Sequence, residues 1–167
     1  MKLVKLYFPV LFIVIIDQLS KNWIKTNFIL WESREILGSF LKFSYVNNPG
    51  IAFGISVGDW VVLITVLSIF ATFFIGYIHW QEQNEHMLIF LAFSFILGGA
   101  IGNLIDRSSV FFVENYVGVV DFIDIGLGMN RWYTFNIADS AVTVGIVLYL
   151  IHSLSFQEKN DLSNETG

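Results

Sequence analysis

Four apolar segments dominate the sequence, and their lengths constrain the fold more than any other feature. We expect them to form transmembrane helices at residues about 6–23, 60–80, 87–105 and 135–154. The second segment contains no Asp, Glu, Lys or Arg. As a helix with a rise of about 1.5 Å per residue it would span about 30 Å, the thickness of a hydrocarbon core. The sequence therefore predicts an all-α polytopic membrane protein with four transmembrane helices.

The composition favours lipid over water as the solvent of this chain. Of its 167 residues, 55% are hydrophobic and only 14% are charged, whereas soluble domains carry roughly 25% charged residues. A single core in so short a chain could not hide this apolar surface from water. The net charge of −5 comes without a basic cluster, so nothing indicates nucleic-acid binding. The absence of Cys excludes thiol catalysis and Cys metal sites.

The segments that connect the expected helices differ greatly in length. The loops at about 24–59 and 106–134 are long, while the second and third helices are joined by a short polar turn around 81–85. Four spans place both termini on one side of the membrane and both long loops on the other. We therefore expect residues 1–167 to form a single membrane domain with a small β-containing loop region on one side.

Local patterns predict the structure of the first long loop and of the tail. Residues Phe40–Val46 alternate apolar and polar side chains, which predicts a β-strand, and Asn47–Gly50 should end it as a turn. Residues Trp31–Leu37 are expected to form a short interfacial helix. The polar tail at 157–167 is expected to be disordered.

The distribution of positive charge leaves the orientation in the membrane open. The side of the termini carries three lysines, whereas the opposite side carries Lys21, Lys25, Arg34, Lys42, Arg107 and Arg131. The positive-inside rule alone would therefore place both termini outside the cell. However, Lys21 and Arg107 adjoin acidic residues in polar motifs, where their charge can serve a site instead of the topology.

Polar residues gather at one end of the expected helices, although nothing in a membrane protein requires this. Asp and Asn beside a transmembrane segment are costly, so each is a candidate functional residue. They are Asp17 and Lys21 after the first apolar segment, Asn103, Asp106 and Arg107 after the third, Asp121 and Asp124 in the second long loop, and Asn136 and Asp139 at the start of the fourth segment.

Several of these residues have a plain structural interpretation. Asp17 and Lys21 are spaced i, i+4 and are expected to form an ion pair on one helix face. For Asp106 beside Arg107, the sequence leaves an ion pair and a contact to substrate equally open. The glycines in Gly98–Gly102 are expected to allow close helix packing.

Asp121 and Asp139 are harder to explain as structural residues. Neither has a Lys or Arg within four residues along the chain, and both lie in apolar stretches. Two such carboxyl groups brought together would share a proton, with one as base and one as acid near neutral pH. An aspartic hydrolase uses this arrangement to activate water.

Other functions remain compatible with single features of the sequence. A small ion- or proton-coupled membrane carrier would also use intramembrane Asp and Asn, but it would need polar groups at both membrane faces. A Ser-Lys peptidase would have to use Ser20 and Lys21, which are adjacent and cannot share a helix face.

Five motifs, taken together and in order, resemble those of the lipoprotein signal peptidase family, also called signal peptidase II. The motifs are Asp17-Gln-Leu-Ser-Lys21, Asn48-Pro-Gly-Ile-Ala-Phe-Gly54, Gly98-Gly-Ala-Ile-Gly-Asn-Leu-Ile-Asp-Arg107, Val119-Val-Asp-Phe-Ile-Asp124 and Phe135-Asn-Ile-Ala-Asp139. The resemblance implies a membrane aspartic endopeptidase that cleaves diacylglyceryl-modified prolipoproteins just before the lipidated Cys. It implies no cofactor, no metal and no nucleic acid, with prolipoprotein substrates and membrane lipid as the partners.

The resemblance also implies an orientation and a role for individual residues. The bacterial cytoplasmic membrane would hold the chain with both termini in the cytoplasm and the active site toward the outer face. The catalytic pair falls on Asp121 and Asp139. The residues expected to contact substrate or support the site are Asn48, Gly50, Asn103, Asp106, Arg107, Asn136, Asp17 and Lys21. One departure is Ile51, where the family usually has a small Ala.

Overall fold

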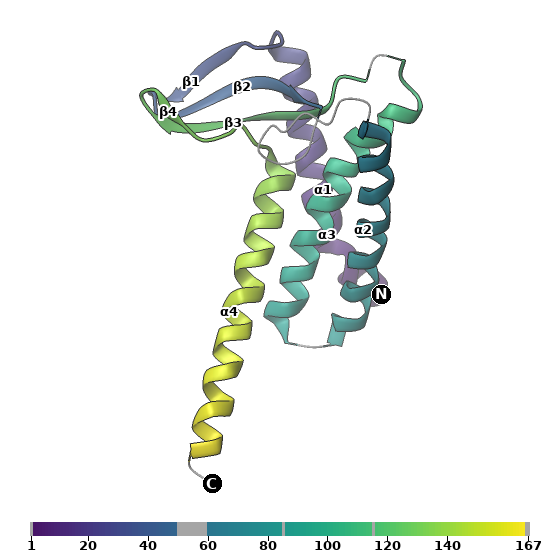
Figure 1. The fold of residues 1–167 in the computed structure, drawn as a ribbon, viewed down its shortest axis with the longest axis vertical. Coiled ribbons are helices and arrows are strands. Elements are labelled where there is room, and N and C mark those ends of the chain that lie inside the picture. The colour runs from purple at the N-terminus through teal and green to yellow at the C-terminus, as the bar shows by residue number, and fades with distance from the viewer. Residues whose placement is uncertain (1, 50–59, 85, 115, 166–167) are drawn as a thin grey trace.

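The structure is a computed structural model that describes residues 2–49, 60–84, 86–114 and 116–165. These residues form a bundle of long helices with an antiparallel sheet at one end (Figure 1). The helices are α1 (Lys2–Asn27), α2 (Val61–Gln81), η3 (Glu82–Asn84), α3 (Met87–Ser108), η4 (Ser109–Phe111) and α4 (Ile137–Glu165). The strands are β1 (Ser33–Leu37), β2 (Leu41–Asn48), β3 (Val119–Leu127) and β4 (Asn130–Arg131).

Helix α3 lies at the centre of the bundle and contacts α1, α2 and α4. Its glycines make these contacts close: a Cβ on Gly98 would lie 2.9 Å from the Cβ of Ile13 on α1, and a Cβ on Gly99 would collide with the carbonyl oxygen of Ala138 on α4. The expected packing role of these glycines is therefore confirmed. Helix α1 begins and α4 ends at the end of the bundle away from the sheet (Figure 1).

Three helices among the described residues are long and apolar enough to cross a membrane. They are Val61–Asn84, Met87–Phe111 and Ile137–Ser155. Large apolar side chains such as Phe70 and Phe73 on α2 are exposed, as expected for a surface that faces lipid. Helix α1 is 26 residues long but is not one of the three, and it buries charged side chains in its second half. The described part of the protein is thus predominantly helical, with three candidate spans and a small sheet.

The sheet has the order β1-β2-β3-β4, and every neighbouring pair is antiparallel. An apolar core joins it to the end of α1, where Ile24 and Phe28 pack with Val120 and Phe122 of β3. This core fixes β3 across the end of the bundle. Asp121, which lies between the two β3 core residues in sequence, is thereby directed to the opposite side of the strand.

The strand predicted at Phe40–Val46 is confirmed as β2, but the helix predicted at Trp31–Leu37 is wrong. Trp31 has a φ of 72°, which is incompatible with the right-handed helix. The residues after it form β1 instead, with Arg34 opposite Phe43 of β2. This pairing satisfies the backbone of a segment that would otherwise lie on the surface without partners.

The prediction of a disordered tail is also wrong, because α4 continues to Glu165. The tail has no Pro and no Gly before Gly167, so nothing in it interrupts a helix. Several of its residues, including Gln157, Glu158 and Lys159, are good helix formers. Polarity was therefore a poor guide to disorder here.

Candidate active site

Asp121 and Asp139 come from different elements and line one cavity of about 750 Å³. Asp121 lies on β3 and is buried, and Asp139 lies in the first turn of α4. Asn136 links them: its Nδ2 donates to Asp121 Oδ1 at 2.7 Å, and its Oδ1 accepts from the backbone N of Asp139 at 2.9 Å. The two carboxyl groups that the sequence marked as unpaired are therefore neighbours in space.

The start of α4 explains how Asp139 is held. Asn136 immediately precedes the helix, and its side chain accepts a hydrogen bond from the third helical residue. Asp139 reciprocates, since its Oδ2 accepts from the backbone N of Asn136 at 3.1 Å. This is the reciprocal pattern of a capping box, with Asn and Asp at its two positions. The helix terminus therefore fixes the orientation of the carboxyl group.

Asp121 accepts hydrogen bonds from two side-chain amides, and its pKa is raised. Its Oδ2 accepts from Nδ2 of Asn48 at the end of β2 at 3.0 Å. Burial in the first place, and then the negative charge of Asp139, raise the pKa of Asp121 to about 7. The pair is thus poised to hold one proton near neutral pH.

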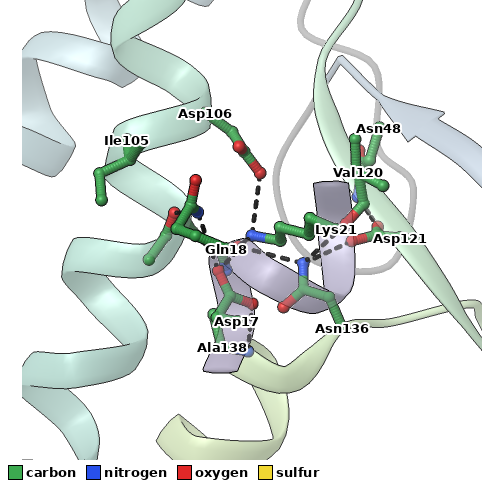
Figure 2. Close-up of polar contacts among 12 residues, drawn as sticks. Asp17, Gln18, Lys21, Asn48, Ile105, Asp106, Val120, Asp121, Asn136 and Ala138 are labelled. Carbon is green, nitrogen blue, oxygen red and sulfur yellow. Dashed lines mark hydrogen bonds and ion pairs between the residues drawn. The ribbon is translucent and has the colours of Figure 1, made fainter. Parts of the chain in front are cut away.

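A second polar cluster lies beside this pair and is built around Lys21 of α1. Its ammonium group is buried and lies 2.8 Å from Asp17 Oδ2 and 2.9 Å from Asp106 Oδ2. It also donates to Asn103 Oδ1 at 2.9 Å. Figure 2 shows Lys21 between the two aspartates, with Asn136 and Asp121 on its other side. Lys21 thus forms two ion pairs and one hydrogen bond.

The cluster decides between the two interpretations of the acidic motifs. The expected ion pair of Asp17 and Lys21 is confirmed. Asp106 forms its ion pair with Lys21, and adjacent helical residues such as Asp106 and Arg107 do not face each other. Asp17 has a further role, because its Oδ1 accepts from the backbone N of Ala138 in the first turn of α4 at 2.9 Å. It thereby ties α1 to the start of α4.

The cavity brings together five of the residues selected from the sequence and adds others. Asn48, Asn103 and Arg107 line it together with the two aspartates. The rest of its wall consists of Val119, Trp132, Tyr133, Thr134, Phe135, Ser140, Val142, Thr143, Val144 and Ile146. None of these was predicted as a site residue, although Val119 and Phe135 begin two of the five motifs. The only sequence signal for the aromatic part of this wall was its position directly before the motif at 135–139.

Asp124 lies on the same strand as Asp121 but serves the sheet. It accepts from Oγ of Ser44 at 3.1 Å and from Nε of Arg131 at 2.7 Å. Arg131 also donates to the carbonyl oxygen of Ser39 at 2.7 Å, so the pair ties β3 and β4 to the β1–β2 turn. In the sequence, Arg131 is only one of the positive charges that bear on topology, and its role in the sheet was not predictable. Gly50 and Ile51, the remaining residues singled out from the sequence, lie outside the described residues.

A family model described as signal peptidase (SPase) II matches residues 9–155 of this chain. The chain belongs to the signal peptidase II family. The family expected from the five motifs is therefore confirmed, and with it a peptidase built on apolar helices. All five motifs lie inside the matched range.

Individual relatives agree with this assignment over nearly the whole chain. A lipoprotein signal peptidase of Shewanella sp. (strain MR-4) is 39% identical over 163 residues, which cover 93% of this chain and 91% of the relative. One from Lactobacillus johnsonii is 36% identical over 150 residues, covering 90% and 92%. A solved bacterial membrane enzyme, determined by the in meso method, superposes with a TM-score of 0.80 at 30% identity, covering 93% of this chain and 90% of that one. Lipoprotein signal peptidases thus share sequence with this protein, and a bacterial membrane enzyme shares its fold.

Proposed function

We propose that this protein is an aspartic endopeptidase that removes the signal peptide from diacylglyceryl-modified bacterial prolipoproteins, cutting just before the lipidated Cys. The observation that carries the proposal is the pairing of Asp121 and Asp139 in one cavity. Among the described residues, neither forms a salt bridge, and both accept hydrogen bonds from amides. The substrate class rests on the relatives, which are lipoprotein signal peptidases.

The chemistry needs one proton on the pair at the start. The ionised carboxylate takes a proton from a water molecule as the water oxygen bonds to the carbonyl carbon of the scissile amide. The protonated carboxyl group gives its proton to the carbonyl oxygen, which yields a neutral gem-diol. General acid–base help of this kind contributes about 10²–10⁴-fold, and positioning supplies the remainder.

Collapse of the gem-diol restores the pair. The carboxyl group that took the water's proton gives it to the amide nitrogen, and the C–N bond breaks to release the amine. A hydroxyl proton of the gem-diol returns to the other carboxylate as the new carboxyl group forms. One water is consumed, and the pair again holds one proton.

Polar residues around the cavity are suited to hold the substrate backbone. The guanidinium group of Arg107 lines the cavity, and its buried Nε has no hydrogen-bond partner within the described parts of the chain. This N–H is a donor available to a substrate carbonyl. Asn48 and Asn103 each donate to one carboxylate and thereby hold the pair where the scissile amide must lie.

The apolar part of the cavity wall suits the hydrophobic signal peptide. Val144 and Ile146 continue the wall along α4 beyond Asp139, and both are at the surface of α4 that remains exposed in the protein alone. A helical signal peptide packed along this face would bring its C-terminal end to the aspartate pair. The diacylglyceryl group would then extend toward the surrounding lipid.

The proposal includes a topology in which α1 is a fourth span of the cytoplasmic membrane. Both termini and the turn at 81–85 would lie in the cytoplasm, with the sheet and the aspartate pair at the outer face. In intact cells, a Gln83→Cys variant should resist a membrane-impermeant thiol reagent, whereas Met129→Cys, at a fully exposed position in the β3–β4 turn, should be labelled. The reverse labelling pattern would contradict this topology.

The function is tested with the purified protein and a synthetic prolipoprotein peptide. Mass spectrometry should show cleavage of the diacylglyceryl-modified peptide immediately before its modified Cys, and the same peptide without the lipid should be cleaved far more slowly. Equal cleavage of both peptides would contradict the substrate class. Folded protein that cleaves neither peptide but conducts ions or protons in vesicles would favour the carrier.

A further inference from the structure

Lys21 forms one hydrogen bond in addition to its two ion pairs. Its ammonium group is only 1% exposed and already lies between two aspartates, Asp17 and Asp106, whose charges more than neutralise it. The ammonium group also donates a hydrogen bond to Asn103 Oδ1 at 2.9 Å. This hydrogen bond connects the ion cluster to the aspartate pair, because Asn103 is also bonded to Asp139.

Asn103 transmits this contact to Asp139. Its Oδ1 accepts from Lys21 and also from Asn136 Nδ2 at 3.0 Å, while its own Nδ2 donates to Asp139 Oδ1 at 2.8 Å. An ammonium group can only donate, so the amide oxygen must face Lys21. The NH₂ group of Asn103 is therefore held toward the carboxyl group and cannot be exchanged for the oxygen by a flip.

The two carboxyl groups of the pair consequently differ in their surroundings. Asp139 accepts from an amide polarised by a cation, and it also lies in the first turn of α4, where the helix dipole favours negative charge. Asp121 lies on a strand and accepts from Asn48 and Asn136. It has no helix terminus at its carboxyl group, and its pKa is raised to about 7 by burial and by Asp139.

We infer that Lys21 is a positioning residue for the catalytic pair, which acts through Asn103 to keep Asp139 ionised as the base and to leave the proton on Asp121 as the acid. The inference rests on the proposed function. It assigns the two protonation states that the mechanism leaves open and gives Lys21 a role beyond holding helices together. The charged groups that surround Asp139 in the described residues are Asp17 and Lys21 on α1, Asp106 and Arg107 on α3, and Asp121 on β3.

The pH dependence of cleavage separates this role from a structural one. The variant Asp17→Asn/Lys21→Met removes the cation but leaves the net charge of the cluster unchanged, because one negative and one positive charge are lost together. In the pH profile of its kcat/KM for the lipidated peptide, the acid limb should lie about one pH unit higher than in the wild type. The reason is that the base is harder to ionise without the cation. The single variant Lys21→Arg keeps the positive charge, so its acid limb should stay at the wild-type position. Lys25→Met removes an exposed lysine one turn along α1 and should leave the profile unchanged.

Asn103→Ala gives an independent test that keeps the ion cluster whole. It cuts the path between Lys21 and Asp139, so it should move the acid limb in the same direction, and adding Asp17→Asn/Lys21→Met to it should move the limb no further. An Asp17→Asn/Lys21→Met variant or an Asn103→Ala variant that is slower at every pH, with the limb in its wild-type position, would overturn the inference. Failure of the wild type to cleave, or an active Asp121→Asn variant, would instead refute the proposed function.

Discussion

Two pairs of aspartates lie at the sheet end of the bundle, and they differ in what neutralises them. Asp17 and Asp106 share the ammonium group of Lys21 at 2.8 and 2.9 Å. Asp121 and Asp139 share the side chain and backbone of Asn136 instead. A buried carboxylate beside a cation keeps its charge, whereas one held by amides can gain and lose a proton. The first pair is thereby suited to fix helices, and the second to catalyse proton transfer.

The largest difference between the pairs should appear in stability. Lys21→Met leaves two buried carboxylates without their cation, which should lower the free energy of unfolding by about 3–5 kcal/mol. Thermal unfolding in detergent measures this effect. Lys25→Met should stay within about 0.5 kcal/mol of the wild type, and Asp121→Asn should not destabilise the protein. An equally stable Lys21→Met variant would show that the ion cluster does not hold the helices.

Asn136, which is bonded to both Asp121 and Asp139, allows a test of the catalytic pair that disturbs stability much less. Asn136→Ala removes the donor to Asp121 and the cap of α4, so turnover should fall on the order of 10- to 100-fold, while the free energy of unfolding should fall by only about 1 kcal/mol. The hydroxyl group of Ser140, one residue past Asp139, donates to the backbone carbonyl oxygen of Asn136, and Ser140→Ala should affect turnover far less. Loss of all cleavage in a stable Ser140→Ala variant would require a serine mechanism.

The pH dependence of the wild type tests the proton on the pair directly. The pKa of Asp121 is raised to about 7, so its carboxyl group is protonated below that pH and ionised above it. Because the mechanism needs this proton, kcat/KM should fall as the pH rises through about 7, by about tenfold per pH unit on the alkaline side. A profile that stays flat from neutral to alkaline pH would show that Asp121 does not supply an essential proton.

The sequence predicted the parts of this protein that depend on segment length and on topology. Apolar length located the helices, and the order of the segments brought Asp121 and Asp139 to one end of the bundle. Contacts that depend on a long side chain crossing between helices were not predictable in this way. Adjacency in sequence suggested Arg107 as the partner of Asp106, yet Lys21 reaches it from α1.

The loops also contain structure that could not be predicted from the sequence. The alternating pattern of β2 was visible in the sequence, but β1 is a strand because β2 is available to pair with it, and a local pattern carries no information about that partner. Likewise, Trp132 and Tyr133 line the cavity only because β3 and α4 meet beside them. Residues whose role depends on a neighbouring element were thus the ones that sequence reasoning missed.

The most direct test of the account is cleavage of the lipidated prolipoprotein peptide by the single variants Asp121→Asn and Asp139→Asn. An amide can neither take the water's proton nor supply one, so each variant should lose detectable cleavage while it inserts and purifies normally. The double variant should be no worse than either single variant, because groups that act as a unit are strongly non-additive. Asp124→Asn, on the same strand but bonded to Ser44 and Arg131, should retain measurable activity. Substantial turnover by either single variant of the pair would contradict the proposed mechanism.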